Sequence, residues 1–232
     1  PGHVYRTHIF QGPGKFIVTS PTITSVEYLV VAGGGGGSEG ANSGGAGGAG
    51  GFRTNVPGTP GSHTSSAPFP VSTSPGEYEV VVGGGGMYGR GPSPYHVSEP
   101  GEDSSFGSIV STGGGAGGGE PPGPYPGLPG GSGGGGGTAS NSTAYPGGAS
   151  VAVTTPSPWP GPATQGFAGG SGQHNPGAWE GGGGGGGAGN VGQDAGPSNH
   201  AGAGGIGIRS LIAGPAYAIG YPGLPPTAPE TT

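Results

Sequence analysis

The residues of this chain that could do chemistry are few, and a serine between glycines is the first candidate. Residues 130–134 (GGSGG) match the G-x-S-x-G pattern, in which a serine is the nucleophile of acyl transfer. That chemistry needs a strand before the serine, a helix after it and a base within reach. Ser132 has glycine on both sides and neither element in its surroundings, so the sequence favours a structural role for it.

Metal and acid–base chemistry have equally weak support. The histidines form no H-E-x-x-H pair and no other close metal-ligand spacing. Glu102 and Asp103 are adjacent in a predicted turn and could hold at most an adventitious cation. The chain has no cysteine, which excludes disulfides and thiolate metal sites. We therefore expect no enzyme activity, no catalytic residue, no cofactor and no metal site.

Nucleotide, nucleic-acid and membrane binding are also disfavoured. Residues 35–40 (GGGSEG) match G-x-G-x-x-G, but any glycine block produces that match, and the helix it requires does not follow. The net charge is −6 with only 5 basic residues, whereas a phosphate-binding surface needs clustered Lys and Arg. No run approaches the roughly 20 apolar residues of a membrane span. The chain starts at Pro1 rather than Met, which suggests a processed or trimmed form.

Aromatic residues in the proline- and glycine-rich turns are the best candidates for binding. An aromatic ring offers a large contact area at low entropic cost. The candidate receptor or surface contacts are Tyr95, Tyr125, Tyr145, Trp159 and Trp179. The alternative is that these rings cap the ends of a bundle and shield its outer segments. Asn141 begins the Asn-x-Ser/Thr sequon of the chain and is a candidate glycosylation site.

Short apolar runs predict the elements that must position these residues. β-Branched and aromatic residues in such runs are typical of strands. The runs are residues 4–10, 15–19, 26–32, 78–82 and 106–111. Residues 11–14 (QGPG) predict a hairpin turn between the first two runs, and residues 57–75 predict a loop or insertion. The result is a small antiparallel β module with essentially no α-helix.

Glycine dominates the rest of the chain, with 66 of 232 residues against a usual share of about 7%. One interpretation is flexible linkers. The other is a bundle of polyglycine II helices, which have three residues per turn, no internal hydrogen bonds and no Cβ to keep neighbouring backbones apart. Low charge and embedded strands favour the bundle. We predict a β module with the first glycine segments over residues 1–112, a polyglycine II bundle with Pro-rich turns over 113–220, and a Pro-rich tail over 221–232.

Several stretches resemble the glycine-rich domains of bacteriophage tail-fibre tips and adhesins. The first is VEYLVVAGGGGG at residues 26–37, and SSFGSIVSTGGGAGGG follows at residues 104–119. The likeness continues at residues 47–54, 78–86, 130–137, 181–195 and 201–214, and together these stretches cover most of the chain. The Pro-rich insertions are heavier than in that family, and the chain ends in a Pro-rich tail where the family has a late glycine block.

The resemblance implies a β module followed by a sandwich of polyglycine II helices, whose end loops bind a receptor on a host surface. We therefore expect a non-enzymatic structural and adhesive protein, extracellular or on a virion, whose partners are other fibre subunits and a bacterial surface receptor or glycan. One alternative is a self-assembling subunit of an extracellular filament, which pairs through an open sheet edge or the apolar residues 206–212. A glycine-rich ice-binding protein is the second alternative.

Overall fold

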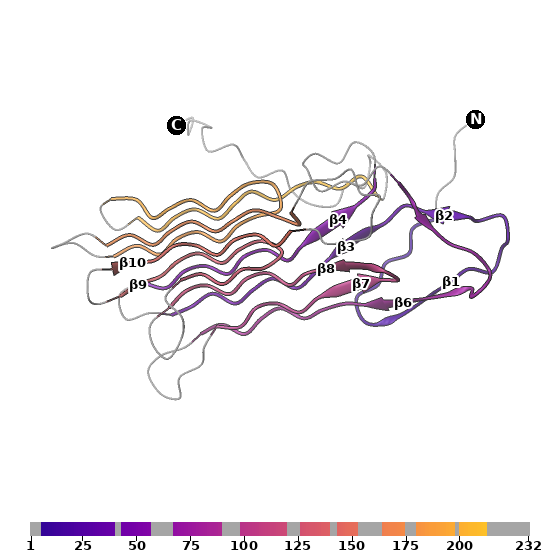
Figure 1. The fold of residues 1–232 in the computed structure, drawn as a ribbon, viewed down its shortest axis with the longest axis horizontal. Coiled ribbons are helices and arrows are strands. Elements are labelled where there is room, and N and C mark those ends of the chain that lie inside the picture. The colour runs from indigo at the N-terminus through magenta and orange to yellow at the C-terminus, as the bar shows by residue number, and fades with distance from the viewer. Residues whose placement is uncertain are drawn as a thin grey trace, which may run out of the picture.

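The computed structural model describes residues 6–39, 43–56, 67–89, 98–119, 126–139, 143–152, 164–174, 180–197 and 200–212. These residues form an elongated molecule, with a β module at one end and long, wavy chain segments lying side by side along the rest (Figure 1). The described residues contain no helix, and their strands form small antiparallel sheets. The coarse expectation of a mainly β and irregular fold is thus confirmed. Within the described ranges, no helix is long and apolar enough to cross a membrane.

The β module contains most of the strands. Its largest sheet has the order β1-β6-β7-β8, with every neighbouring pair antiparallel. These strands are β1 (Gly14–Ile17), β6 (Glu77–Val81), β7 (Ser104–Phe106) and β8 (Ile109–Ser111). Two smaller sheets pair β2 (Ser25–Val26) with β5 (Phe69–Pro70), and β3 (Leu29–Val31) with β4 (Phe52–Thr54). A third pairs β9 (Thr138–Ala139) with β10 (Thr143–Ala144) at the opposite end of the molecule, here called the distal end (Figure 1).

Side chains hold this module together. Tyr28, Val30 and Ile109 form the buried core cluster, and Phe69 and Phe106 pack against it. The rings of Phe69 and Phe106 lie 4.8 Å apart between centroids. Apolar burial of this kind contributes roughly 25 cal/mol per Å² of surface removed from water. The strands form where the sequence supplies enough large apolar residues to make one compact core.

The predicted hairpin between residues 4–10 and 15–19 is wrong. Within the described residues from Arg6 onward, the segment 6–10 forms no strand, and β1 pairs with β6 instead. Phe16 lies opposite Tyr78 in that register, and Lys15 Nζ donates to Glu77 Oε2 at 2.7 Å. Pairing with β6 brings the Phe16 ring to 5.7 Å from that of Phe106 between centroids, so a distant pairing that reaches the core replaces the near one.

Two predicted strands are divided, and one predicted loop contains a strand. Residues 106–111 form the end of β7, a turn and β8, because Gly107 has a φ of +56°, which favours glycine. Residues 26–32 are split between β2 and β3, where the Tyr28 N–H donates to Asn55 Oδ1 at 2.8 Å. Within the predicted loop 57–75, the described part contains β5. The sequence did not indicate β4.

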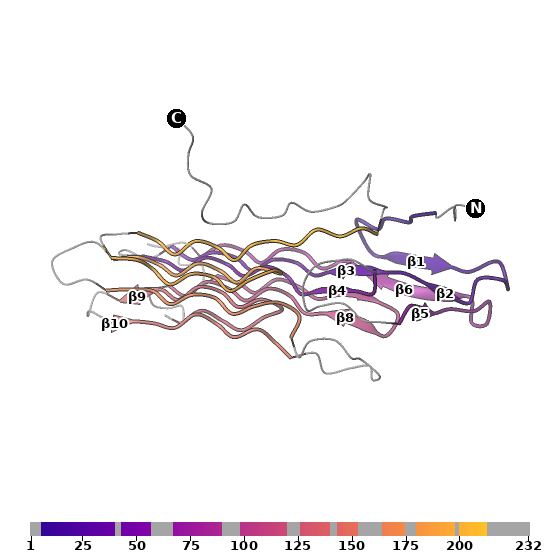
Figure 2. The ribbon, with the colours of Figure 1, turned by 90° about the horizontal axis from the view of Figure 1, so that it is seen from above.

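Backbone hydrogen bonds between glycine segments form the rest of the fold, and Figure 2 shows the segments stacked in layers. Segment 181–187 is the clearest case. Its N–H groups donate to segments 133–136, 190–193 and 167–173, and its carbonyls accept from segments 46–49, 167–173 and 202–205. Among the described residues it therefore bonds to five other segments. A segment with this many backbone neighbours lies inside the bundle.

The bonds of segment 181–187 repeat every third residue. Gly183 and Gly186 donate to Gly136 and Gly133, at 2.9 and 2.8 Å. Their carbonyls accept from Ala46 and Ala49, at 3.1 and 3.0 Å. The same spacing recurs in segment 113–118, where Gly114 and Gly117 donate to Gly33 and Gly36 at 2.8 and 2.9 Å. Each face of a segment thus meets one neighbour at every third residue.

The interior glycines of the bundle have no room for a side chain. A Cβ on any residue of segment 181–187 would come within 3.0 Å of another atom, a separation that real Cβ atoms essentially never show, and the atom is usually a backbone carbonyl. Segment 43–51 instead carries Ser43, Ala46 and Ala49 at every third position. At the glycines between them, a Cβ would again come within 3.0 Å of another atom. Glycine is therefore required wherever a face of a segment meets another backbone.

Candidate functional site

The structure places Ser132, the candidate nucleophile, in the interior of the bundle. Its side chain is fully buried, and Oγ donates to the Gly187 carbonyl at 3.1 Å. Glycine segments surround it, and no strand and helix flank it within the described residues. A buried hydroxyl paired with a carbonyl can supply a cross-link between two segments, because a buried polar group needs a partner.

Glu102 and Asp103 are engaged with backbone N–H groups. Gly84 N–H donates to Glu102 Oε2 at 3.0 Å, and Gly113 N–H donates to Asp103 Oδ1 at 2.8 Å. The two carboxylates thus each terminate a different glycine segment. Within the described residues, no group of three or more His, Asp or Glu side chains could hold a metal ion.

A pair that sequence reasoning missed joins the two chain segments that flank residues 175–179. His174 Nδ1 and Glu180 Oε1 lie 2.6 Å apart, and their side chains are 16% and 9% exposed. Gln173 and Gly181 form an antiparallel bridge just outside the pair. The two residues are six apart in a glycine-rich stretch, which is no recognised ligand or acid–base spacing. The pair therefore holds together the two chain segments that end at His174 and begin at Glu180.

The charged group at the junction of the β module and the bundle is Arg53. It is 2% exposed, and Nη1 donates to the Val110 carbonyl at 2.8 Å. Burial lowers the pKa of Arg53 from its ordinary value, and Tyr28 acts in the opposite direction. The guanidinium joins β4 to β8 from inside the protein, where a dissolved substrate has no access.

Of the predicted contact residues, Tyr95, Tyr125, Trp159 and Trp179 lie outside the described residues, as do Asn141 and the predicted tail 221–232. Tyr145 is described and is half-buried directly after β10. Its N–H donates to the Gly137 carbonyl at 3.2 Å, and its carbonyl accepts from Gly172 at 2.9 Å. It therefore lies at the distal end of the bundle.

Several of the chain segments between the described ranges are flanked by residues that also lie at the distal end. Glu39 N–H donates to the Gly89 carbonyl at 3.0 Å, and bridges join Ser43 to Thr138 and Gly196 to His200. The flanking pairs at this end are Glu39 and Ser43, Gly89 and Ser98, Gly119 and Pro126, Ala139 and Thr143, His174 and Glu180, and Pro197 and His200. The chain segments that carry Tyr95, Tyr125, Asn141 and Trp179 begin and end here.

Trp159 differs from the other predicted contacts. Its segment lies between Ala152 and Thr164, which form a bridge with each other. The next residue, Gln165, accepts from the Phe52 N–H at 3.0 Å through its carbonyl and from the Thr112 N–H at 2.7 Å through Oε1. Since Phe52 begins β4, this segment starts and ends beside the β module.

Tyr88 was missed as a contact candidate. It is 61% exposed and its neighbour Met87 is 56% exposed, and both precede the distal residue Gly89. The available signal was its position after a glycine block and before a Pro-rich turn, the same context as the predicted contacts. The described part of the distal end thus presents Tyr145 and Tyr88.

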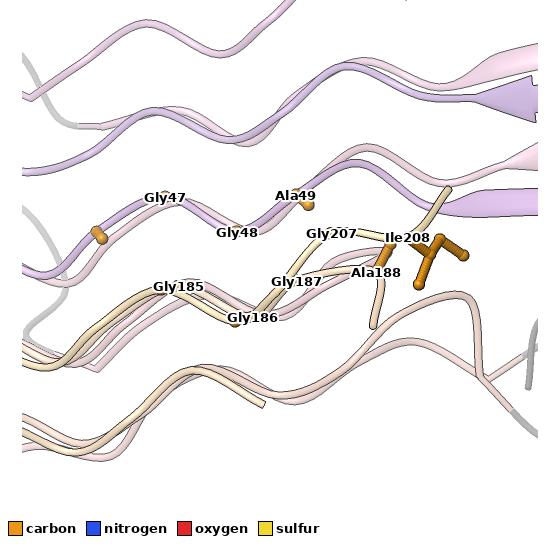
Figure 3. A pocket seen from close by; sticks show the side chains of 12 residues that line it. Gly47, Gly48, Ala49, Gly185, Gly186, Gly187, Ala188, Gly207 and Ile208 are labelled. Atoms are coloured by element: carbon orange, nitrogen blue, oxygen red, sulfur yellow. The ribbon is translucent and has the colours of Figure 1, made fainter. Parts of the chain in front are cut away.

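An open groove of about 460 Å³ runs along one face of the bundle. Residues of three segments line it: 46–49, 185–188, and 204, 205, 207 and 208. Figure 3 shows that Ile208 at one end is the only large side chain among the lining residues, and that alanine methyl groups and bare glycine backbone form the remainder. A surface of this kind offers peptide groups and little else for recognition.

Comparison with known proteins gives one match. A family model described as a glycine-rich domain matches residues 11–223, nearly the whole chain. No curated protein and no solved structure matches it. The matched range includes the β module and every glycine segment discussed above, so the chain belongs to the glycine-rich domain family.

Proposed function

We propose that the glycine segments are polyglycine II helices, packed as a scaffold. The support is the hydrogen bonding of segment 181–187, whose partners recur every third residue. A helix of the polyproline II type has three residues per turn, and all its peptide groups point sideways. Circular dichroism of the purified chain tests this assignment: the far-ultraviolet spectrum should combine β and polyproline II features, and an α-helical spectrum would contradict it.

The scaffold serves a non-enzymatic, adhesive protein of an extracellular fibre or a phage tail fibre. The observation that carries this proposal is the distal end, where the flanks of four predicted contact or modification residues meet on a rigid bundle. Loops displayed on a rigid scaffold are well suited to recognition. The burial of Ser132 and the pairing of Glu102 and Asp103 with backbone N–H groups agree with a protein without catalytic chemistry.

The partner that fits this distal end is a bacterial surface receptor or glycan. Tyrosine and tryptophan combine a broad apolar face with one hydrogen-bonding group, and such residues are enriched at binding hot spots. The proposed contact set is Tyr95, Tyr125, Tyr145 and Trp179, with Tyr88 beside it. The resemblance to tail-fibre tips and adhesins supports the same kind of partner.

Binding of the full chain to intact bacterial cells and to arrayed bacterial surface glycans tests this proposal. Trp179→Ala should reduce binding to a recognised cell or glycan by roughly 30-fold, the loss of about 2 kcal/mol expected at a hot spot. Trp159→Ala is the matched control, because its segment starts and ends beside the β module. Equal losses in both variants, or no binding to any probe, would refute the adhesive role.

A second candidate function is a subunit of an extracellular filament. The sheet order leaves β1 and β8 at its two edges; the buried Arg53 covers β8, whereas β1 carries Ile17, which is 57% exposed. An edge strand with exposed apolar residues is a template for pairing with another chain. Negative-stain electron microscopy of concentrated protein distinguishes the two functions, because only a filament subunit forms regular fibres unaided.

A further inference from the structure

The ring of segments around residues 181–187 is open on one side. Going round it, segment 46–49 bonds to 132–135, and segment 133–136 bonds to 167–170. Segment 168–171 then bonds to 192–195, and Gln193 bonds to Ala203. Among the described residues, no backbone bond joins segment 202–208 back to segment 46–49. The groove lies between these two segments.

An N–H group points into this opening. Gly183, Gly184, Gly186 and Gly187 donate to other segments, whereas the N–H of Gly185 has no acceptor among the described residues. The N–H and C=O of a trans peptide point in opposite directions. Because the Gly184 carbonyl accepts from Gly170, the Gly185 N–H points away from that segment and toward the groove. Gly185 is itself buried, and an unpaired buried N–H is unfavourable.

The walls of the groove supply the complementary groups. The carbonyls of Gly47 and Gly205 have no donor among the described residues. The N–H groups of Ala46 and Gly205 already bond to segment 181–187, and the carbonyls of Ala46 and Ala203 bond to other segments. On the first wall the Gly48 carbonyl accepts from Gly35. On the second wall the Gly204 carbonyl points opposite to the Gly205 N–H and therefore away from segment 181–187. With three residues per turn, the one carbonyl direction left on each wall, that of Gly47 and of Gly205, faces the groove. The groove therefore presents one donor row and two acceptor rows.

We propose that this groove binds residues 83–86 of a second copy of the chain. Those residues are four consecutive glycines on the surface, and Gly84 and Gly85 are exposed. A Cβ on Gly85 would meet nothing closer than the Gly34 carbonyl at 3.6 Å, so this face of the segment is uncovered. The Gly85 N–H and the Gly83 and Gly86 carbonyls have no partner among the described residues. The segment thus offers both donors and acceptors to the groove, and it has no side chain that would prevent it from entering.

The geometry of this contact makes it open-ended. The groove and residues 83–86 are different surfaces of one chain, so each copy can bind one neighbour and be bound by another. Copies joined head to tail in this way form an open chain of molecules unless the rotation from one copy to the next closes a ring. The inference rests on the proposed polyglycine II packing but does not depend on host binding, and backbone hydrogen bonds provide its specificity as they do when a strand is added to a sheet edge.

Two variants of the full chain separate the two surfaces. Gly204→Val places a side chain in the groove, where its Cβ would have only the Gly185 carbonyl nearby at 3.9 Å. Gly85→Val places a side chain on the bound segment, and within its own chain a Cβ there would meet nothing closer than the Gly34 carbonyl at 3.6 Å. Gly12→Val is the control, because a Cβ there would meet nothing within 4 Å and Gly12 belongs to neither surface.

Sedimentation velocity over a range of concentrations measures the association. The wild type and Gly12→Val should form oligomers that grow with concentration, whereas each blocking variant alone should associate at least about tenfold more weakly. An equimolar mixture of Gly204→Val and Gly85→Val should form one-to-one complexes and stop there, because one intact groove and one intact segment remain.

Three outcomes would overturn the inference: a wild type that stays monomeric, blocking variants that associate like the wild type, or a mixture that does not pair. Slow amide exchange at Gly185 in a monomeric wild type would assign the groove to a segment of the same chain instead. Circular dichroism of each variant checks the fold, so a failure of docking is distinguishable from a failure of the polyglycine II packing.

Discussion

The β module and the glycine bundle are stabilised in opposite ways. In the module, Tyr28, Val30 and Ile109 exclude water with large side chains, and the strands position them. In the bundle, the backbone itself is the packed material, and a single Cβ on Gly184 would collide with the Ala203 carbonyl. One region therefore loses stability when side chains are removed, and the other when they are added.

This difference also divides the two regions by sequence tolerance. Exposed positions of the module accept ordinary substitutions, whereas most interior bundle positions require glycine. Alanine is allowed where a face of a segment is free, as at Ala46 and Ala49, and Ala116 and Ser132 are interior exceptions at 1% and 0% exposure. The following variants test the comparison, beginning with the largest expected effect.

Gly184→Val should be the most damaging change. Its side chain would have to displace the backbone of residues 202–203, since the Cβ lies far inside contact distance of Ala203. We expect a loss of roughly 4 kcal/mol or more in the free energy of unfolding, a size reserved for severe overpacking. Urea denaturation followed by circular dichroism measures it.

Gly12→Val provides the reference for that experiment within the β module. A Cβ at Gly12 would meet nothing within 4 Å, so the free energy of unfolding should change by less than about 0.5 kcal/mol. If Gly184→Val and Gly12→Val were equally stable, segment 181–187 would be a linker and the bundle interpretation would fail.

Ile109→Ala tests the side-chain core of the module. Ile109 is 2% exposed and belongs to the cluster with Tyr28 and Val30, so the truncation removes buried methyl groups and leaves a cavity. We expect a loss of about 3 kcal/mol by urea denaturation. Val110→Ala on the same strand, at 41% exposure, should cost much less. Similar losses in the two variants would argue against a side-chain core.

Ser132→Ala tests a side-chain bond inside the bundle. The change removes the 3.1 Å bond from Ser132 Oγ to the Gly187 carbonyl, which keeps a second bond from the Phe167 N–H at 3.2 Å. Loss of one bond of this kind costs about 1 kcal/mol. Differential scanning calorimetry should show a modestly lower Tm, with Ser108→Ala at an exposed turn as control. A rise in Tm would mean that the buried Ser132 hydroxyl destabilises the bundle.

Glu77→Gln should have the smallest effect on stability and a clear effect on Lys15. The hydrogen bond and the negative charge of Glu77 raise the pKa of Lys15 above its ordinary 10.5. The stabilisation that accompanies this raised pKa is present at neutral pH and is lost only as the pH rises past the Lys15 pKa, but it is small because the pair is exposed. Since both side chains are largely exposed, at 63% and 51%, the urea midpoint at pH 7 should not move. NMR titration should show the Lys15 pKa falling toward 10.5 in the variant.

The sequence predicts the strands better than their pairing. Apolar runs contain all of β3 and β8 and most of β1 and β6, because burial of β-branched residues is a local preference. The partner of β1 lies more than 60 residues away, as the contact of Lys15 with Glu77 shows, and local turn chemistry at residues 11–14 pointed elsewhere. Pairing depends on the whole core, which no short window contains.

The order of the glycine segments could not be predicted for a different reason. Two glycine blocks are chemically identical, so composition cannot tell which lies inside. The spacing of the small residues carries some of that information: Ser43, Ala46 and Ala49 mark one free face, whereas residues 181–187 mark none. The distal position of the residues that flank the aromatic segments and the pairing of His174 with Glu180 depend on that order, and therefore appear only in the structure.

The central place of segment 181–187 has a consequence for synthesis of the protein. A ribosome releases the first strands and residues 33–51 long before it adds the glycines that satisfy Ala46 and Ala49. Contacts between such distant parts of a chain form slowly. The early glycine backbone must therefore stay hydrogen-bonded to water, and the bundle can close only after residue 187 has been synthesised. The length of the nascent chain thus determines when the bundle can fold.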